Sequence, residues 1–404
     1  MKLDMRKTFI LGLGFFGINL LWPVYNAFVP IMLEQYTTKA TLIGLIMTID
    51  NLFAVVFQPV FGAMSDRTKN RFGRRMPYIL IGMPISALLF SVIPYTNRLG
   101  ALMLTIIIMN FTMSIYRAPT VALMPDITPS PLRSKANGII NFMGGLAAVI
   151  AYLFGGLLYR KNPSYPFHLS SVVMIMALFI LFIFIKENTD FTIEKKKAKE
   201  KRKDVGKTRS LIFLLLAVFF WFSGYNAVET FFSLYAQYVL KIDPSRASIL
   251  LSIFSASFLI FAIPSGYIGT KFGRRMTILV GVTGVTLTFA PLIFIKTVPL
   301  ISVLFVVGGF FWALININSY PMVVEIAPKN GVGTYTGYYY FFSASSAVLS
   351  PILFGFIKDL IGSYGILFFY SVISFVIALI CMSIVKHGDV ELDDEKKLAL
   401  ELNS

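Results

Sequence analysis

Three ionisable side chains stand inside long apolar stretches of this sequence of 404 residues: Asp50, Arg117 and Glu229. A charge at the depth of a lipid bilayer costs at least about 2.5 kcal/mol, so such groups are functional candidates. A buried carboxyl group can hold a proton, and a guanidinium that moves into contact can replace that proton as its partner. We therefore treat these three residues as candidate ion-coupling groups. The structural alternative for Asp50 and Arg117 is a permanent buried ion pair.

Amide and aromatic side chains occupy the same apolar stretches. Sugar sites need amides and carboxylates for hydroxyl groups, and aromatic faces for the C–H side of the ring. Each of these residues could instead serve helix packing. Trp22, Asn318 and Tyr338 to Tyr340 share this character. The candidate substrate-binding residues are Tyr25, Asn26, Asn51, Asn110, Tyr225, Asn226, Trp312 and Asn316.

Motifs of soluble enzymes are missing from the sequence. It has no Gly-x-x-x-x-Gly-Lys-Ser/Thr phosphate loop, which argues against an ATP-driven pump. His168 and His387 are isolated, and with the single Cys381 they cannot assemble a metal cluster. Gly12-x-Gly14-x-x-Gly17 lies within an apolar stretch, where small residues let helices approach one another. We expect no enzymatic activity, no metal and no cofactor, with a proton as the coupling ion.

Composition indicates the solvent in which these residues work. Hydrophobic residues make up 56% of the chain and charged residues 14%, and the mean hydropathy is +0.75. Soluble domains keep roughly a quarter of their residues charged. The net charge of +16 lies in short loops and one linker rather than on a stripe of a soluble fold, which argues against nucleic acid as a partner. The sequence predicts an all-α membrane protein.

The apolar stretches have the length of transmembrane helices, which need about 20 residues each. On this rule the sequence predicts twelve spans, six before and six after a charged linker. The first six lie over 8–33, 41–65, 77–95, 100–124, 135–158 and 168–186. The second six lie over 210–240, 246–270, 276–295, 298–324, 333–357 and 364–386.

The distribution of Lys and Arg predicts the orientation of these spans. With the N-terminus inside, cytoplasmic segments carry 27 of them and the opposite side eight, and Arg117 completes the 36. Because positive residues are retained on the cytoplasmic side, we expect both termini and the linker to be cytoplasmic. The basic residues before the first span resemble a signal peptide, but no small-residue cleavage site follows. We interpret that segment as an uncleaved first span.

An internal repeat divides the chain into two halves. Phe72-Gly73-Arg74-Arg75-Met76 recurs 200 positions later as Phe272-Gly273-Arg274-Arg275-Met276. Three further pairs match in register: Tyr25-Asn26-Ala27 with Tyr225-Asn226-Ala227, Leu153-Phe154-Gly155 with Leu353-Phe354-Gly355, and Asp126-Ile127-Thr128-Pro129 with Glu325-Ile326-Ala327-Pro328.

Such a repeat predicts two pseudo-symmetric six-helix bundles with a ligand site between them near mid-membrane. Asn26 and Asn226 are the best substrate candidates, because equivalent positions would flank the axis. The predicted divisions are a first bundle over 1–186, a cytoplasmic charged linker over 187–209, a second bundle over 210–386 and a short acidic cytoplasmic tail over 387–404.

Twelve spans, the repeat and the loop from Gly62 to Tyr78 resemble the major facilitator superfamily. Ser65-Asp66-Arg67, followed by Arg71-Phe72-Gly73-Arg74-Arg75-Met76-Pro77-Tyr78, is similar to the loop of the sucrose:proton symporter and solute carrier family 45 group. The glycoside-pentoside-hexuronide symporters have a related loop. The superfamily resemblance covers essentially the whole chain, whereas the subfamily resemblance rests mainly on this loop and the fourth span.

The coupling residues of those groups do not transfer directly. Val121 stands where the plant transporters have an Arg, and Asn110 where they have an intramembrane Asp thought to take the proton. Arg117 lies one helical turn before Val121 and could reach the same volume. The paired acids of the melibiose-type sodium site would fall at Ala54 and Gln58, which weakens the case for sodium coupling there.

The resemblance also implies a cytoplasmic gate. A loop of Asp and Arg can hold helix ends in one conformation and release them in another. We expect Asp126 to pair with Arg75 and Glu325 with Arg275, asymmetrically, because Thr270 replaces Asp66 in the second loop. The predicted gate residues are Asp66, Arg67, Arg71, Arg74, Arg75, Asp126, Arg274, Arg275 and Glu325.

Together these features predict a monomeric, multi-pass transporter of a bacterial or archaeal cell membrane. It would move a sugar, a di- or oligosaccharide or glucoside, inward with protons by alternating access. Three alternatives remain: a sodium-coupled glycoside symporter, a drug or lipid exporter, and a sugar sensor. An exporter would favour an apolar cavity with few amides. The short acidic tail and the lack of an output domain argue against a sensor.

Overall fold

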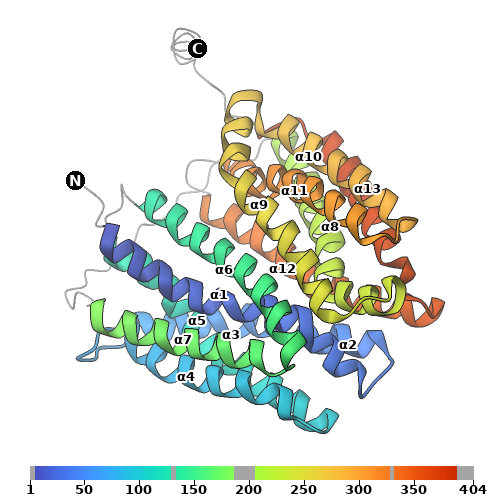
Figure 1. Ribbon diagram of the computed structural model, residues 1–404. Coiled ribbons are helices and arrows are strands. Elements are labelled where there is room, and N and C mark those ends of the chain that lie inside the picture. Colours follow the sequence, from blue (N-terminus) through green and yellow to red (C-terminus); the bar gives the residue numbers. More distant parts are fainter. Residues whose placement is uncertain (1–4, 129–132, 186–204, 328–331, 389–404) are drawn as a thin grey trace.

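The computed structural model describes residues 5–128, 133–185, 205–327 and 332–388. These ranges contain helices and no strand, and twelve spans are long and apolar enough to cross a membrane (Figure 1). The predicted all-α membrane fold is confirmed. Most of the expected linker and tail lie outside the described ranges, and the end of the expected linker, from Val205, already belongs to a helix.

The first half contains six spans. The second span is divided into two helices, α2 and α3, which separate at Thr48. The helices are α1 (Met5–Glu34), α2 (Ala40–Met47), α3 (Ile49–Arg67), α4 (Met76–Val92), α5 (Leu99–Ile127), α6 (Arg133–Lys161) and α7 (Tyr165–Phe184).

The second half repeats this order, and its first span is extended by one π-helical turn. The helices are α8 (Val205–Tyr235), η3 (Ala236–Leu240), α9 (Pro244–Phe272), α10 (Arg274–Phe289), α11 (Val298–Ile326), α12 (Val332–Ile361) and α13 (Leu367–Ile384).

Corresponding helices pack in the same way in both halves. In the first half α1 packs against α6 and α7, and α5 packs against α3 and α4. In the second half α8 packs against α12 and α13, and α11 packs against α9 and α10. The two bundles form separate groups in Figure 1. This shared packing confirms the two pseudo-symmetric six-helix bundles.

The break at Thr48 places Asp50 at a helix start. The Thr48 hydroxyl donates a hydrogen bond to the Leu45 carbonyl at 3.0 Å, and Asp50 lies in the first turn of α3. Backbone N–H groups at a helix N-terminus stabilise a negative charge. Broken helices at the centre of a bundle are where transporters commonly place ligand and ion sites. The span expected over 41–65 was continuous and placed Asp50 inside a helix. The break instead places Asp50 at the start of one.

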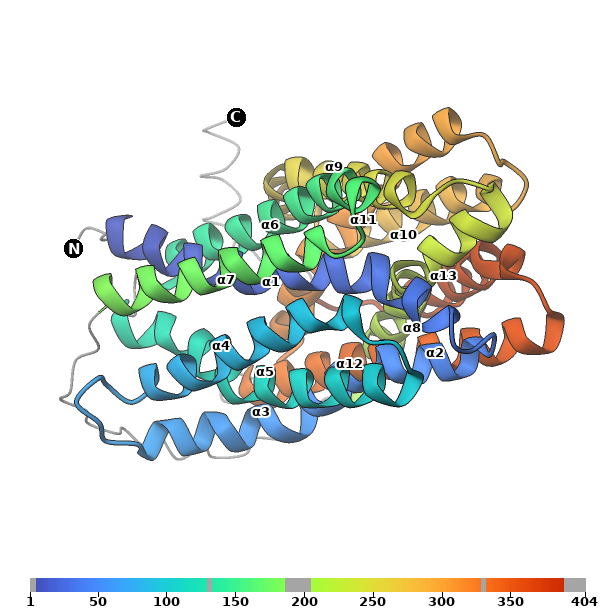
Figure 2. The same ribbon diagram turned by 60° about the horizontal axis from the view of Figure 1, so that its bottom comes forward.

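The two halves meet at the end of the molecule opposite the start of α1 and the end of α13. We call this the distal face, and the other end the terminal face (Figure 2). At the distal face the Asp359 carboxylate of α12 accepts hydrogen bonds from the N–H groups of Ala40 and Thr41, at 2.8 and 2.9 Å. It also accepts one from the Thr41 hydroxyl at 2.6 Å, and Lys358 donates to the Thr38 carbonyl at 3.0 Å. A residue of the second half therefore caps a helix of the first.

Close backbone contact accompanies this cap. A side chain at Gly44 would collide with the backbone of Pro351, and one at Gly355 with the backbone of Ala40. Only glycine lets the backbones of α2 and α12 approach this closely. The pseudo-equivalent contact between α6 and α9 has a hydrogen bond from the Ser248 hydroxyl to the Tyr152 carbonyl at 2.6 Å.

Candidate functional site

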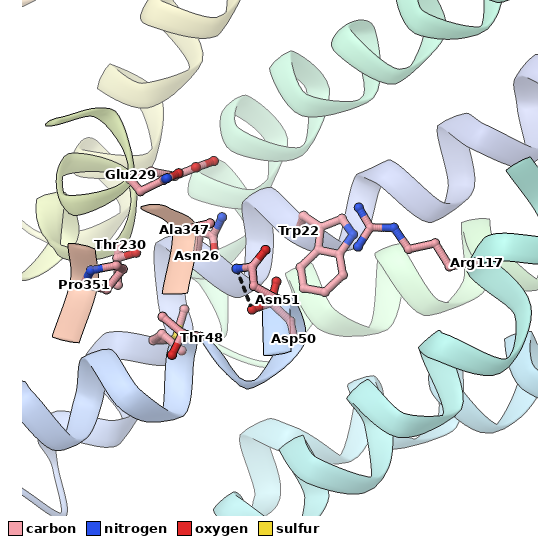
Figure 3. A pocket seen from close by; sticks show the side chains of 12 residues that line it. Trp22, Asn26, Thr48, Asp50, Asn51, Arg117, Glu229, Thr230, Ala347 and Pro351 are labelled. Atoms are coloured by element: carbon pink, nitrogen blue, oxygen red, sulfur yellow. Dashed lines mark hydrogen bonds between the residues drawn. The ribbon is translucent and has the colours of Figure 1, made fainter. Parts of the chain in front are cut away.

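A cavity of about 200 Å³ lies between the two halves (Figure 3). On its distal side it is bounded by α2 and α12, the helices that the Asp359 cap joins. Two thirds of its lining residues are polar or charged. They are Trp22, Asn26, Met47, Thr48, Asp50, Asn51, Arg117, Asn226, Glu229, Thr230, Ala347 and Pro351.

All three candidate ion-coupling residues line this cavity. The Asn51 amide donates a hydrogen bond to the Asp50 carboxylate at 3.0 Å. The Arg117 guanidinium lies over the Trp22 ring, 5.2 Å from its centroid, on the side away from Asp50 in Figure 3. Within the described ranges Arg117 forms no ion pair. The permanent pair considered as the alternative is therefore absent in this conformation, although both groups share one cavity.

Glu229 lies where side chains from both halves meet. It comes from α8, and its carboxyl group is faced by the side chains of Asn26 from α1, Tyr152 from α6 and Tyr225 from α8. As expected from the sequence, none of these partners is basic. The nearby charged group that acts on it is Asp50, the carboxyl group of the other half. One acidic residue from each half thus faces the same space.

Three of the predicted substrate residues, Asn26, Asn51 and Asn226, line the cavity. The Asn226 amide donates to the Ser346 hydroxyl at 3.4 Å, which orients it from α12. The equivalent positions Asn26 and Asn226 face one cavity from opposite halves, as the repeat predicted. Thr48, Thr230 and Tyr152 were not predicted for this region. Only the proximity of Thr230 to Glu229 in sequence could have indicated one of them.

Tyr25 and Asn110 lie behind the cavity wall instead of on it. Each is 1% exposed, and neither the Tyr25 hydroxyl nor the Asn110 amide atoms have a hydrogen-bond partner in the described chain. Asn110 and Asp50 are the polar groups that act on the Tyr25 hydroxyl. These two residues therefore form a layer behind Asp50, and direct contact with a solute in the cavity is excluded in this conformation.

The remaining predicted substrate residues belong to the packing of the second half. The rings of Tyr225 and Trp312 are stacked, with centroids 4.5 Å apart. Asn316 does not line the cavity, and Asn318 donates to the carbonyl groups of Ser265 and Leu314 at 3.1 and 3.0 Å. Tyr339 is hydrogen-bonded to Ser319 at 3.0 Å. For Trp312 and Asn318 the packing alternative describes this conformation.

A second, smaller cavity of about 20 Å³ adjoins Glu229, and all of its lining residues except Tyr152 belong to the second half. Its lining is mainly aromatic and aliphatic, and Glu229 is the residue that it shares with the larger cavity. It is lined by Tyr152, Tyr225, Val228, Glu229, Leu251, Phe254, Ser255, Phe289 and Phe305.

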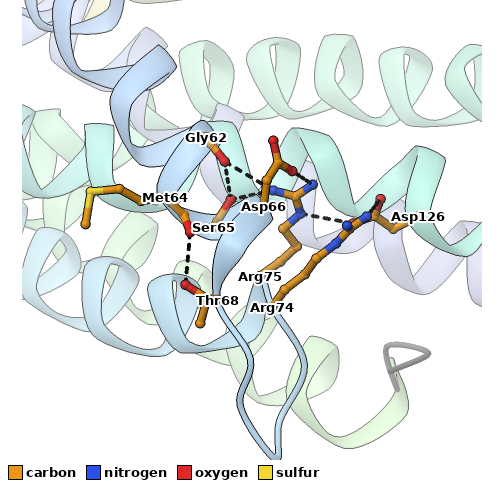
Figure 4. Close-up of polar contacts among 8 residues, drawn as sticks. All are labelled: Gly62, Met64, Ser65, Asp66, Thr68, Arg74, Arg75 and Asp126. Atoms are coloured by element: carbon orange, nitrogen blue, oxygen red, sulfur yellow. Dashed lines mark hydrogen bonds and ion pairs between the residues drawn. The ribbon is translucent and has the colours of Figure 1, made fainter. Parts of the chain in front are cut away.

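Four of the predicted gate residues form a compact cluster at the end of α3 (Figure 4): Asp66, Arg74, Arg75 and Asp126. Arg74 and Arg75 both pair with Asp126, with N–O distances of 3.1 Å from Arg74 Nε and 3.0 Å from Arg75 Nε. Arg75, which is 4% exposed, also donates to the Asp66 carboxylate and the Ser65 hydroxyl. The expected pair of Arg75 with Asp126 is present, and Arg74 shares the carboxylate.

The second loop differs from the expected pairing. Glu325 pairs with Arg274 at 3.1 Å and not with Arg275, which instead donates to the backbone carbonyls of Ser383 and Val385 at the end of α13. The guanidinium of Arg71 stacks on its neighbour Phe72 at 4.6 Å, and Arg67 is exposed. The ion pairs of each loop join residues of the same half: those of the first loop lie in the first half and that of the second loop in the second half. In this conformation they order each bundle and do not join the two.

Comparisons with known proteins give the wider context. The model of the Major Facilitator Superfamily matches residues 8–243 and 232–401. The chain is 24% identical over 281 residues to the class H tetracycline resistance protein of Pasteurella multocida, which covers 66% of this chain and 67% of that protein. It is 28% identical over 198 residues to the proton-associated sugar transporter A of Rattus norvegicus, covering 45% of this chain but only 26% of that protein.

Solved structures share the fold. A bacterial homologue of the human lysosomal transporter Spinster, in an inward-facing and occupied conformation, superposes with a TM-score of 0.74 at 13% identity, covering 95% of this chain and 97% of that one. A variant of the nucleoside transporter NupG superposes with a TM-score of 0.74 at 15% identity, covering 94% and 100%. At these identities the likeness establishes the fold alone.

Proposed function

Because the chain belongs to the Major Facilitator Superfamily, we propose that this transporter moves a sugar together with protons, by alternating access of one central cavity. The observation that carries the proposal is the cavity between the halves. It has one carboxyl group from each half, a guanidinium and three amides around a single volume. Such a site suits a solute rich in hydroxyl groups and a proton carried by a carboxyl group.

The charges of the cavity support proton coupling. With both carboxyl groups ionised, Asp50, Glu229 and Arg117 carry one net negative charge. One bound proton brings the sum to zero, and uncompensated charge is costly in a site that closes away from water. Closing the cavity around a neutral solute and one proton would therefore cost the least electrostatic free energy.

Lining and size both favour a small polar solute. Pockets for drug-sized ligands have about 300–1,000 Å³ and are lined mainly by apolar groups. This cavity has about 200 Å³ and a mainly polar lining. In this conformation it suits a monosaccharide unit better than the di- or oligosaccharide expected from the sequence. The match to tetracycline resistance proteins keeps drug export as a second candidate, which the polar lining disfavours.

We further propose that the protein is a monomer in the cell membrane with both termini in the cytoplasm. The terminal face would then be cytoplasmic and the distal face external. In that orientation the Asp359 cap closes the external side in this conformation. The external contact between α2 and α12 would have to separate for a solute to enter from outside.

Uptake into proteoliposomes tests the proposal. The purified protein is reconstituted, a pH gradient is imposed, and the uptake of radiolabelled glucose, maltose and sucrose is measured, with trapped pyranine reporting proton entry. Sugar accumulation that collapses with a protonophore is the expected result. Tetracycline transport without sugar transport would favour the exporter. Saturable sugar binding with no flux of sugar or protons would favour a sensor and contradict transport.

A further inference from the structure

The small cavity beside Glu229 has the size of a water site. A buried water needs at least about 10–15 Å³, and this cavity has about 20 Å³. It lies among α8, α9, α10 and α11, with Tyr152 of α6 at its edge. Five of its nine lining residues are Val, Leu or Phe. The other four lining residues are polar: Tyr152, Tyr225, Glu229 and Ser255.

The polar partners match the needs of a buried water, which makes about three hydrogen bonds. The phenol groups of Tyr152 and Tyr225 face the Glu229 carboxyl group, and each can donate a hydrogen bond. Ser255 of α9 also lines the cavity, and its hydroxyl group forms no hydrogen bond to the described part of the chain. The carboxyl group, the two phenols and the Ser255 hydroxyl therefore surround a space for one molecule.

Glu229 separates this space from the substrate cavity. It is the one residue that lines both cavities, and Asn26 and Thr230 line only the larger one. The ionisable groups that face Glu229 are Asp50 of α3, Tyr152 of α6 and Tyr225 of α8. A solute in the larger cavity and a water in the smaller one can thus contact the same carboxyl group without sharing space.

We propose that the small cavity is a proton-loading site: it holds one water molecule through which Glu229 gains and loses the coupled proton. This inference rests on the proposed proton-coupled function. A hydronium ion in the site gives a proton to a carboxylate oxygen of Glu229 and becomes neutral water, and the same step in reverse releases the proton. Transfer through one water is an established route for a proton to reach a carboxyl group. The substrate cavity need not empty for this step.

Variants of Ser255 test the site. Ser255→Val fills the space of the water, and Ser255→Ala removes one hydrogen-bond partner but keeps the space. Proteoliposomes carrying each protein are assayed for uptake of the best sugar among glucose, maltose and sucrose under a pH gradient. The same vesicles are assayed for sugar exchange at equal pH, which requires no net proton transfer. We expect Ser255→Val to lower gradient-driven uptake about tenfold or more, Ser255→Ala to lower it less, and exchange to stay within about twofold.

Ser252→Ala is the matched control, because its hydroxyl group donates to the Ile249 carbonyl of its own helix at 2.6 Å. It should leave both assays unchanged. Retained exchange shows that each Ser255 variant is folded; should Ser255→Val lose it, the comparison of Ser255→Ala with wild type decides. Gradient-driven uptake within twofold of wild type in the folded Ser255 variants overturns the water site.

Two further outcomes separate this inference from the proposed function. A wild-type protein that shows no uptake driven by a pH gradient contradicts the proposed proton coupling itself. Wild-type uptake that requires Na⁺ in place of choline at fixed pH, and falls in Ser255→Val, would assign the site to sodium and overturn the water. Wild-type uptake driven by pH with the Ser255 variants unaffected leaves the function standing and removes only the water site.

Discussion

Asp50 and Glu229 come from opposite halves of the molecule and face the same cavity. Their surroundings differ. Asp50 lies in the first turn of α3, with the Asn51 amide 3.0 Å from its carboxylate. Glu229 is faced by an amide and two phenols, all of which can donate a hydrogen bond. At the scale of single residues the two carboxyl groups are therefore not equivalent. Each should be substituted separately, so that its own contribution to proton coupling can be measured.

Neutral variants of the two acids test proton coupling. Asp50→Asn and Glu229→Gln should each lower pH-driven accumulation of sugar roughly tenfold or more, because neither amide can carry a proton between the two sides. Exchange at equal pH should persist. Asp243→Asn, an exposed acid at the start of α9, serves as the control. Normal accumulation by both cavity variants would contradict the proposed coupling.

The repeated amides test sugar binding. Asn26→Ala and Asn226→Ala should each raise the KM for sugar about fivefold, the loss of roughly 1 kcal/mol for one hydrogen bond. Asn316→Ala should leave KM unchanged, because Asn316 does not line the cavity. Kinetics of exchange measure this directly. Equal effects of all three substitutions would indicate that the cavity is not the binding site.

At the scale of elements, the loop between α3 and α4 is held by one buried guanidinium. Arg75 connects Ser65 and Asp66 at the end of α3 with Asp126 at the end of α5. The corresponding loop of the second half reaches Glu325 through Arg274 and the end of α13 through Arg275. One Arg-Arg motif therefore makes different connections in the two halves, because the sequence around it is only partly repeated.

Removing Arg75 should destabilise the first bundle. Arg75→Ala removes hydrogen bonds to Ser65, Asp66 and Asp126, while Arg74 still pairs with Asp126. Each hydrogen bond to a charged group contributes about 1.5–3 kcal/mol. We expect a clear fall in the melting temperature of the protein in detergent. Arg71→Ala is the matched control, since Arg71 stacks on Phe72 at an exposed position. Equal melting temperatures for the two variants would refute the structural role of Arg75.

At the scale of the whole molecule, the distal cap is one of the polar contacts that tie the first half to the second, together with the hydrogen bond from Ser248 to Tyr152. Asp359 reaches the start of α2, whereas the pseudo-equivalent helix α9 is capped from within its own half by Asp243. The two halves are thus related by packing but not by capping. Because the cap spans the interface, its strength adds to the stability of the distally closed conformation and not to that of either half alone.

Loss of the Asp359 charge should shift this equilibrium. In a Cys381→Ser background, spin labels at Asn97→Cys and Thr297→Cys report the separation of two exposed distal loops. Asp359→Ala removes a cap worth about 1–2 kcal/mol, so the population with separated loops should rise about 5- to 30-fold. Asp243 caps α9 within its own half, so Asp243→Ala should leave the distance distribution unchanged. Identical distributions for the two variants would rule out the cap as a determinant of closure.

The sequence alone determined the class of protein and the arrangement of its halves. Span lengths and the repeated Phe-Gly-Arg-Arg-Met loop are features of the linear sequence, so they can be read without knowing which helices touch. The cost of a charge in a bilayer likewise identified Asp50, Arg117 and Glu229, and all three line the cavity. Each of these inferences depends on one stretch of chain or on the likeness of two stretches, and none depends on contacts between them.

Only the tertiary structure decided which side chains share a space. It placed Trp22 beneath Arg117, withdrew Tyr25 and Asn110 behind the wall, and paired Glu325 with Arg274. It also brought Ser255 to Glu229 and Asp359 to the start of α2. These contacts join residues that are far apart in the chain or differ by one position on a helix, where the rotation of 100° per residue selects the neighbour. Spacing tells which residues share a face of one helix but not which neighbouring helix that face meets, so packing between helices decided these contacts.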